Sequence, residues 1–269
     1  MKSEPQEAQQ LTEERAIANL RQKSDLGARY YAAWWLGKFR VNTPEAINAL
    51  LQALEDESDR APDGGYPLRR NAARALGKLG DKKAVPPLIR CLEFPDFYVR
   101  EASAQALETL EDKSCIPALM KLLAGGVEGA KFVPGKPHLT QPYEAVIEAL
   151  GTLNATEATP LIEDFIKHPV DKVKYAAARA MYQLTNQAQY GEILVQALSG
   201  DDLQLRRSAL MDLAAVGYLR AGQAIADTLA ENSMKLIALK GLLEKNLQKN
   251  TSPLDRENQQ IMNLMDSLL

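Results

Sequence analysis

Hydrophobic positions recur along the chain in a unit of about 31 residues. In the first half of each unit, Ala and Leu stand at i, i+3 and i+4 spacing, and the second half opens with a proline near its start. The spacing is typical of an amphipathic helix, and a proline costs little in a helix's first turn. Each unit is therefore predicted to be a helical hairpin, and no segment shows the alternation that predicts a strand.

One large apolar position sets the register of the copies. It is filled in chain order by Leu36, Leu76, Leu107, Leu150, Met181, Leu213 and Leu242. Two of the steps, of 40 and 43 residues, are longer than the rest and carry insertions. A single hairpin cannot bury its apolar face, whereas stacked hairpins bury a continuous core. The sequence thus predicts an all-α fold, an α-solenoid (superhelix) of short HEAT-like repeats.

The predicted chain has three parts. Residues 1–24 are expected to hold an N-terminal capping helix, over about 6–23, because the ends of a solenoid need caps. The repeats are expected over 25–246, and a linker with a C-terminal capping helix over 247–269.

The two insertions, near 56–66 and 125–141, are the clearest departures from the repeat. Insertions of this kind fall on one face of a solenoid and often form its working surface. Polar and aromatic residues gather in or beside them: Asp59, Arg60, Asp63, Tyr66, Arg69, Lys131, Lys136, His138 and Tyr143. The alternative interpretation is an ordinary solvated loop.

The first copy departs in another way, because it places Tyr31, Trp34 and Trp35 where other copies hold polar or small residues. Trp34 occupies a position that most copies give to solvent. An exposed aromatic patch implies that something covers it. The N-terminal helix is the first candidate, and a partner protein or a flat conjugated ligand is the alternative.

A basic residue stands seven positions before the anchor in six of the seven copies. These are Arg29, Arg69, Arg100, Lys174, Arg206 and Lys235. In three copies an aspartate precedes the basic residue by four positions, at Asp25, Asp96 and Asp202. An anion-binding ladder would use such a row. We favour helix N-caps followed by basic residues that pair within or between repeats.

Composition excludes several classes. A net charge of −3 argues against a general nucleic-acid binder, and no apolar run approaches the roughly 18 residues of a membrane span. Cys91 and Cys115 are interpreted as small buried thiols, and with two histidines they leave no ligand set for a metal. The polar N-terminus lacks the apolar core of a signal peptide, so we expect a cytoplasmic protein.

Three segments carry a more specific signal. They are YYAAWWLGKFR (30–40), EDESDRAPDGGYPLRRNAARALGKLGDKKAVPPLIRCLE (55–93) and GKPHLTQPYEAVIEALGTL (135–153). These segments resemble the E subunit of the E/F-type phycobilin lyases, HEAT-like proteins of cells that carry phycobilisomes. The likeness covers nearly the whole chain, including both insertions, and is nearest to subunits that act on phycocyanin.

That resemblance implies a heterodimer with an F-type lyase subunit. The pair would attach phycocyanobilin, as substrate and without a further cofactor, through a thioether bond to a cysteine of the phycocyanin alpha chain. The enzyme must then orient a flat chromophore, neutralise its propionates and hydrogen-bond its pyrrole N–H groups. Candidate residues for bilin or partner binding are Tyr31, Trp34, Trp35, Asp63, Tyr66, Arg69, His138 and Tyr143. The resemblance assigns no catalytic role among them.

Three other functions fit the same sequence. The chain could be a non-enzymatic HEAT adaptor that binds phycobiliproteins, or the E subunit of the isomerising lyase for phycoerythrocyanin. A purely structural solenoid is the third alternative, which the aromatic patch and the insertions make less attractive.

Overall fold

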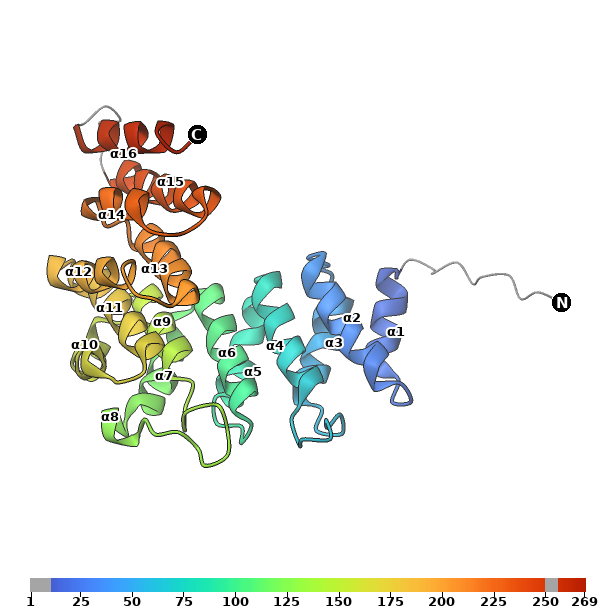
Figure 1. Ribbon diagram of the computed structural model, residues 1–269. Coiled ribbons are helices and arrows are strands. Elements are labelled where there is room, and N and C mark those ends of the chain that lie inside the picture. Colours follow the sequence, from blue (N-terminus) through green and yellow to red (C-terminus); the bar gives the residue numbers. More distant parts are fainter. Residues whose placement is uncertain (1–10, 250–255) are drawn as a thin grey trace. The chain divides into compact units, whose positions relative to one another are not determined.

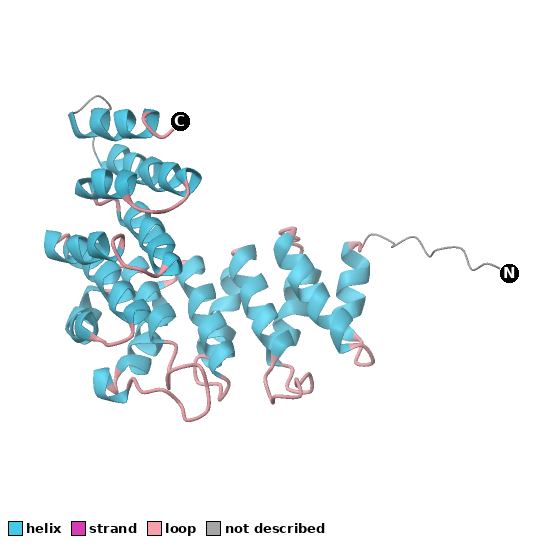
Figure 2. Ribbon diagram, in the orientation of Figure 1, coloured by secondary structure: helices cyan, strands magenta, loops and turns pink. Residues whose placement is uncertain are grey.

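A computed structural model describes residues 11–249 and 256–269 of the chain, and these form helical hairpins (Figure 1). Within these residues no β-strand is present (Figure 2). In the same residues a single isolated β-bridge joins Phe132 and Leu139. The prediction of an all-α solenoid of helical hairpins is confirmed.

The chain divides into two compact units. The first is Met1–Leu119 with Phe132–Pro142, and the second is Met120–Lys131 with Tyr143–Leu269. The chain passes between them within one helix, α7, and again at both ends of the segment 132–142. This division does not address the predicted caps and central solenoid, whose boundaries stay a prediction.

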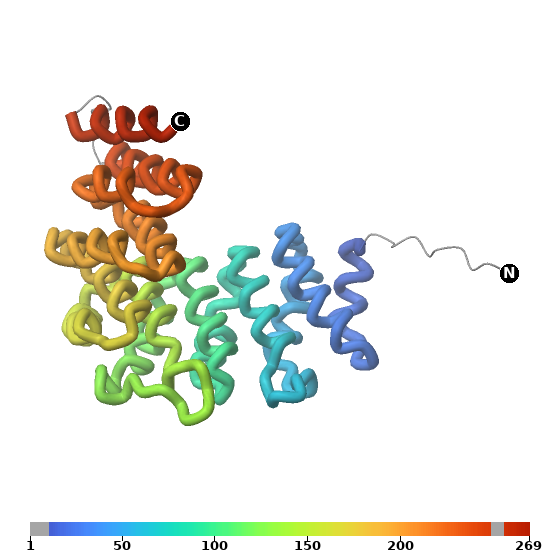
Figure 3. Tube along the Cα trace, in the orientation of Figure 1, coloured from blue at the N-terminus to red at the C-terminus, as the bar shows by residue number. Residues whose placement is uncertain are grey.

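The helices of the first unit alternate between the two halves of each hairpin. In chain order they are α1 (Glu13–Arg21), α2 (Leu26–Lys38), α3 (Pro44–Glu55), α4 (Pro67–Leu79), η1 (Lys82–Ala84), α5 (Val85–Cys91), α6 (Phe97–Leu110), η2 (Lys113–Cys115) and the start of α7 (Ile116–Leu123). The first helices of successive hairpins, α2, α4 and α6, pack side by side, with α3 against α4 and α5 against α6. Figure 3 follows this alternation along the trace.

The second unit repeats the arrangement. Its helices are α8 (Gly126–Gly129), α9 (Tyr143–Thr152), η3 (Thr156–Ala158), α10 (Thr159–Glu163), η4 (Asp164–Lys167), α11 (Asp171–Thr185), α12 (Ala188–Ala197), α13 (Leu203–Val216), η5 (Leu219–Ala221), α14 (Gly222–Asp227), α15 (Asn232–Lys249) and α16 (Arg256–Asp266). Helices α9, α11, α13 and α15 pack in succession, and α16 packs on α14 and α15.

Most of the local signals act as expected. The side chains of Asp25, Asp96 and Asp202 accept hydrogen bonds from backbone N–H groups of α2, α6 and α13, so the N-cap interpretation is confirmed. Four of the second helices, α3, α5, α7 and α10, open with a proline in their first turn, where the missing N–H would have had no partner. The prediction of a proline is wrong for α12 and α14, which contain none. A turn of 3-10 helix precedes several of the second helices.

The predicted register is confirmed by burial, since all seven anchor residues are at most 1% exposed. Small residues let the first helices approach closely. A Cβ added to Gly77 of α4 would lie 2.8 Å from the Cα of Ala106 in α6. The core therefore consists of large anchors between helices that touch at small residues.

Only part of the predicted N-terminal helix can be described. Residues 6–10 lie outside the described residues, and α1 covers Glu13–Arg21. Ala16, Ile17 and Leu20 of α1 are buried, and the helix packs on α2 and α3.

Candidate functional site

The two insertions form one cleft in the first unit, here named the insertion cleft. Loop 56–66, the segment 132–142 and the start of α6 border an open cleft with a volume of about 690 Å³. The residues that line it are Arg60, Asp63, Gly64, Gly65, Tyr66, Pro95, Asp96, Phe97, Tyr98, Arg100, Val133, Lys136, Pro137, His138 and Thr140. In Figure 1 both loops leave the same end of the helices of this unit. The volume is that of a small-molecule site.

The first insertion places one carboxylate and one guanidinium at the cleft. Gly64 has φ +87°, which L-residues rarely adopt, so the loop can turn tightly there. The N–H of Gly65 donates to Oδ1 of Asp63 at 3.0 Å, which leaves the exposed carboxylate fixed in direction. Arg60 donates to the carbonyl oxygen of Gly64 at 3.1 Å and lies 4.9 Å over the ring of Tyr66.

Buried charges hold the base of this loop. Arg29 donates to Oδ2 of Asp56 at 2.5 Å, and Ser58 donates to the other oxygen of the same carboxylate. Burial acts to raise the pKa of Asp56, but hydrogen bonds from Ser58 and Arg29 outweigh it and hold the pKa at about 2. Asp59 is 2% exposed, and burial raises its pKa. The start of the loop is therefore anchored to α2 through Arg29.

The second insertion contributes a small hairpin. The N–H of Val133 donates to the carbonyl oxygen of His138 at 3.0 Å, and Gly135 at the tip has φ +71°. At the base, Nη2 of Arg100 in α6 donates to the carbonyl oxygen of Thr140 at 2.9 Å. The hairpin is thus tied to the helix that lines the cleft.

Aromatic rings line the cleft between the insertions. The rings of Phe97 and His138 stack at 4.2 Å and 12°, and Tyr98 meets His138 edge-on at 5.7 Å. Nδ1 of His138 lies 2.9 Å from the carbonyl oxygen of Leu139, which can only accept, so Nδ1 carries a hydrogen. Nε2 is then the ring nitrogen that can exchange a proton with a ligand.

Arg69 lies behind the cleft and supports it. Its Nε donates to the carbonyl oxygen of Leu54, and its guanidinium stands 3.9 Å over the ring of Phe94. That ring in turn meets Tyr66 edge-on at 4.8 Å. The buried arginine therefore sets the position of Tyr66 without lining the cleft itself.

The predicted aromatic patch lies on α2, on a surface named here the α2 aromatic face. Its members are exposed large side chains: Leu26, Tyr30, Tyr31 and Trp34. Tyr31 and Trp34 are 51% and 40% exposed, and their rings lie 5.3 Å apart. Trp35 is half-buried and packs against Phe39 at 5.0 Å. The prediction that the N-terminal helix covers the patch is wrong for residues 11–21, because α1 leaves both side chains exposed.

Tyr143 is placed apart from the other candidates. It begins α9 in the second unit, is 3% exposed and packs against Phe165 at 5.3 Å. The structure therefore brings together Asp63, Tyr66 and His138, and places Tyr143 in a core.

Sequence reasoning did not identify Phe97, Tyr98 and Arg100 as residues that line the cleft between the insertions. The repeat itself holds a signal, since Phe97 stands 31 residues after Tyr66 and so at the same position of the next copy. Residues at one position of consecutive copies fall on the same face of the stacked hairpins, and both Tyr66 and Phe97 line the cleft.

The two cysteines are buried thiols, as predicted. Burial raises the pKa of both, and that of Cys115 reaches about 11. The Sγ of Cys115 donates to the carbonyl oxygen of Asp112 at 3.0 Å. Across residues 11–249 and 256–269, no group of three acidic, His or Cys side chains could hold a metal ion. No helix in the same ranges has the length and apolarity needed to cross a membrane.

Comparison with known proteins agrees with this architecture. A family model for HEAT repeats matches residues 59–129 and 142–214, and one for the PBS lyase HEAT-like repeat matches residues 28–56. Phycocyanobilin lyase subunit alpha of Picosynechococcus sp. PCC 7002 is 62% identical over 267 residues, which cover 99% of this chain and 100% of that protein.

A solved structure is similar along the whole chain. It is the complex of CpcE and CpcF of phycocyanin lyase from Nostoc sp. PCC7120, with a TM-score of 0.89 and 63% identity over 100% of this chain and 99% of that chain. The bilin biosynthesis protein PecE of Nostoc sp. PCC 7120 is 45% identical, over 90% of each chain.

The stacked helical hairpins and the two family models define a HEAT-repeat protein. The chain belongs to the family of phycocyanobilin lyase alpha subunits, and it is a lyase subunit.

Proposed function

We propose that this chain is one subunit of a heterodimeric phycocyanobilin lyase that works with an F-type partner. The pair attaches phycocyanobilin through a thioether bond to a cysteine of the phycocyanin alpha chain. The observation that carries the proposal is the 63% identity to a chain of the complex of CpcE and CpcF, over both insertions. The lower identity of PecE, 45%, favours this function over that of the isomerising lyase.

We further propose that the bilin binds in the insertion cleft. Tyr66, Phe97 and His138 offer faces for a flat conjugated system. Asp63 presents an exposed carboxylate that can accept hydrogen bonds from pyrrole N–H groups.

Two cations at the cleft suit the propionates of the bilin. Arg60 and Lys136 come from different insertions, both are exposed, and no described carboxylate forms an ion pair with either. Each is therefore available to a ligand carboxylate, and an arginine can bind one through two parallel hydrogen bonds.

The chemical step needs little from the protein beyond orientation. The acceptor's sulfur bonds to the outer carbon of the ring A ethylidene group, the C=C π bond breaks, and the adjacent ring carbon takes up a proton. The proton lost by the thiol balances the one gained. Among the groups that line the cleft, Nε2 of His138 is suited to relay that proton, and the cleft residues hold the reacting atoms in register.

We also propose that the protein works in the cytoplasm. Both cysteines are buried and unpaired, which is typical of proteins from a reducing compartment.

The test is covalent transfer by the assembled pair. This chain and its F-type partner are incubated with phycocyanobilin and the phycocyanin alpha chain. Formation of the covalent adduct is followed by its fluorescence, and its absorption spectrum is recorded. We expect Asp63→Ala to lower the rate by about tenfold or more, because a charge-assisted hydrogen bond to the bilin is lost.

Asp81→Ala is the matched control. Asp81 accepts a hydrogen bond from the N–H two residues later, as Asp63 does, but it lies outside the cleft. Absence of any adduct from the wild-type pair would overturn the lyase proposal and favour a non-enzymatic adaptor. Equal rates for Asp63→Ala and Asp81→Ala would remove Asp63 from the site.

A further inference from the structure

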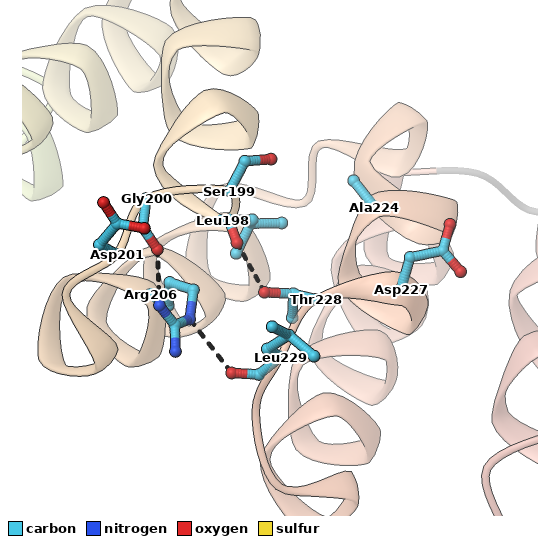
Figure 4. Close-up of a pocket in the computed structure, with 9 residues that line it drawn as sticks. All are labelled: Leu198, Ser199, Gly200, Asp201, Arg206, Ala224, Asp227, Thr228 and Leu229. Atoms are coloured by element: carbon cyan, nitrogen blue, oxygen red, sulfur yellow. Dashed lines mark hydrogen bonds between the residues drawn. The ribbon is translucent and has the colours of Figure 1, made fainter.

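Arg100 and Arg206 stand at the same position of two copies, seven residues before the buried anchors Leu107 and Leu213. In the second unit, Arg206 bridges two chain turns. Its Nη1 donates to the carbonyl oxygen of Gly200 at 2.5 Å and its Nε to that of Leu229 at 3.1 Å (Figure 4). In the plain repeat this arginine therefore joins a helix end to the loop that leads into the next hairpin.

Arg100 shares one of these contacts and differs in the other. Its Nη1 donates to the carbonyl oxygens of Phe94 at 2.7 Å and Pro95 at 2.8 Å, and its Nη2 reaches Thr140 in the second insertion. Its Nε is buried and has no hydrogen-bond partner among the described residues. Arg100 thus keeps the contact of Arg206 to the carbonyl oxygen six residues earlier, but its second contact is to the insertion hairpin instead of the loop before the next hairpin.

The hairpin held by this contact carries His138. Thr140 follows His138 by two residues, and Val133 binds the His138 carbonyl across the hairpin. Phe97, against which His138 stacks, lies on the same helix as Arg100 and follows the turn of Phe94 and Pro95. One guanidinium therefore fixes both sides of the stack, the helix start and the hairpin.

We propose that Arg100 is a positioning residue for bilin transfer. This structural arginine of the repeat fixes the insertion hairpin and so places His138 and Phe97 in the cleft. The inference rests on the proposed function, because it assigns the bilin to that cleft. Arg100 acts through the hairpin and takes no part in the chemistry.

The test compares Arg100→Lys with Arg206→Lys in the complex with the F-type partner. Lysine keeps the charge but lacks the planar fork that reaches two sets of carbonyls at once. Both variants lose one arginine bridge, so both are expected to lose a similar amount of thermal stability. Three further measurements separate them: hydrogen exchange of residues 132–141, the transfer rate for phycocyanobilin, and the absorption spectrum of bound bilin.

We expect Arg100→Lys to speed hydrogen exchange in residues 132–141, to lower the transfer rate by about tenfold or more and to alter the absorption spectrum of bound bilin. Arg206→Lys is expected to leave the exchange rate and the transfer rate within about twofold of the wild type, and the absorption spectrum of bound bilin unchanged. Unchanged exchange in residues 132–141 of Arg100→Lys, or equal transfer rates in the two variants, would overturn the proposal. Failure of the proposed function can be distinguished from failure of this inference. In the first case the wild-type complex itself would not bind or transfer bilin, while hydrogen exchange would still report on the hairpin.

Discussion

Five of the six recurring basic side chains bind backbone carbonyl oxygens, and Lys174 binds the carboxylate of Asp171 instead. Arg69 donates to Leu54 in the last turn of α3, and Lys235 donates to Ala226 in α14 at 2.9 Å. The last carbonyls of a helix lack intrahelical partners and carry a partial negative charge, so a cation there is stabilising. The row of basic residues is therefore structural, and an anion-binding ladder is not needed to explain it.

The predicted pairing within or between repeats is confirmed at Arg29 and Lys174, which form ion pairs with Asp56 and Asp171. Arg29 forms its ion pair with Asp56 of the following loop, while Asp25 caps α2. The aspartate and the arginine that share a spacing in the sequence thus serve two separate helix ends.

At the residue scale, Cys115 gives a prediction about alkaline stability. Burial raises the pKa of its thiol from 9.0 to about 11, so the folded state holds the proton more tightly than the unfolded state. Its contribution to the free energy of unfolding is fully present below pH 9 and is lost as the pH rises to about 11. We expect a loss of roughly 2 kcal/mol over that range.

The measurement is denaturant unfolding between pH 8 and pH 11 for the wild type and Cys115→Ala. The alanine variant is less stable throughout, because a buried side chain is shortened, but its stability should fall less steeply with pH. Parallel curves for the two proteins would contradict the assigned pKa.

At the element scale, the approach of α4 to α6 depends on Gly77. An added methyl group would lie 2.8 Å from the Cα of Ala106, and the backbone cannot yield as a flexible side chain can. Alanine gains about 1 kcal/mol in helix propensity over glycine, but overpacking typically costs 1–3 kcal/mol and should dominate here. We expect Gly77→Ala to lower the free energy of unfolding by about 1–2 kcal/mol.

Lys78→Ala serves as its control, because Lys78 is the next residue of α4 and its side chain is exposed. That change should stay within about 0.5 kcal/mol of the wild type. A Gly77→Ala protein as stable as Lys78→Ala would show that the two helices can separate at no cost.

At the scale of the whole molecule, the α2 aromatic face needs a cover that the described chain does not provide. Both tryptophans of the protein are on α2, so their fluorescence reports on this surface. In Trp35→Phe, Trp34 is the only tryptophan, and it is 40% exposed. We expect its emission to shift to shorter wavelength when the F-type partner binds, because an exposed indole loses contact with water.

The partner is added in excess, and complex formation is verified independently by gel filtration. A complex that forms while the emission of Trp34 stays at its original wavelength would contradict this prediction. Quenching by phycocyanobilin alone would instead assign the face to the ligand.

Much of this protein can be predicted from the sequence because its fold is local and repetitive. The spacing of Leu76 and Leu107 predicts hairpins, since each helix contacts mainly its neighbours along the chain. The Asp96 cap can be predicted because the same residue recurs in other copies, and the insertions can be predicted because they interrupt the repeat.

The insertion cleft depended on tertiary structure. The loop 56–66 and the segment 132–142 are separated by two complete repeats, and no local pattern indicates that they line one site. The sequence analysis placed Tyr143 and His138 in one candidate site because they lie five residues apart. Tyr143 is in a core, whereas His138 lines the cleft. Side-chain direction and the path of long loops are decided by packing, and a one-dimensional pattern does not contain that packing.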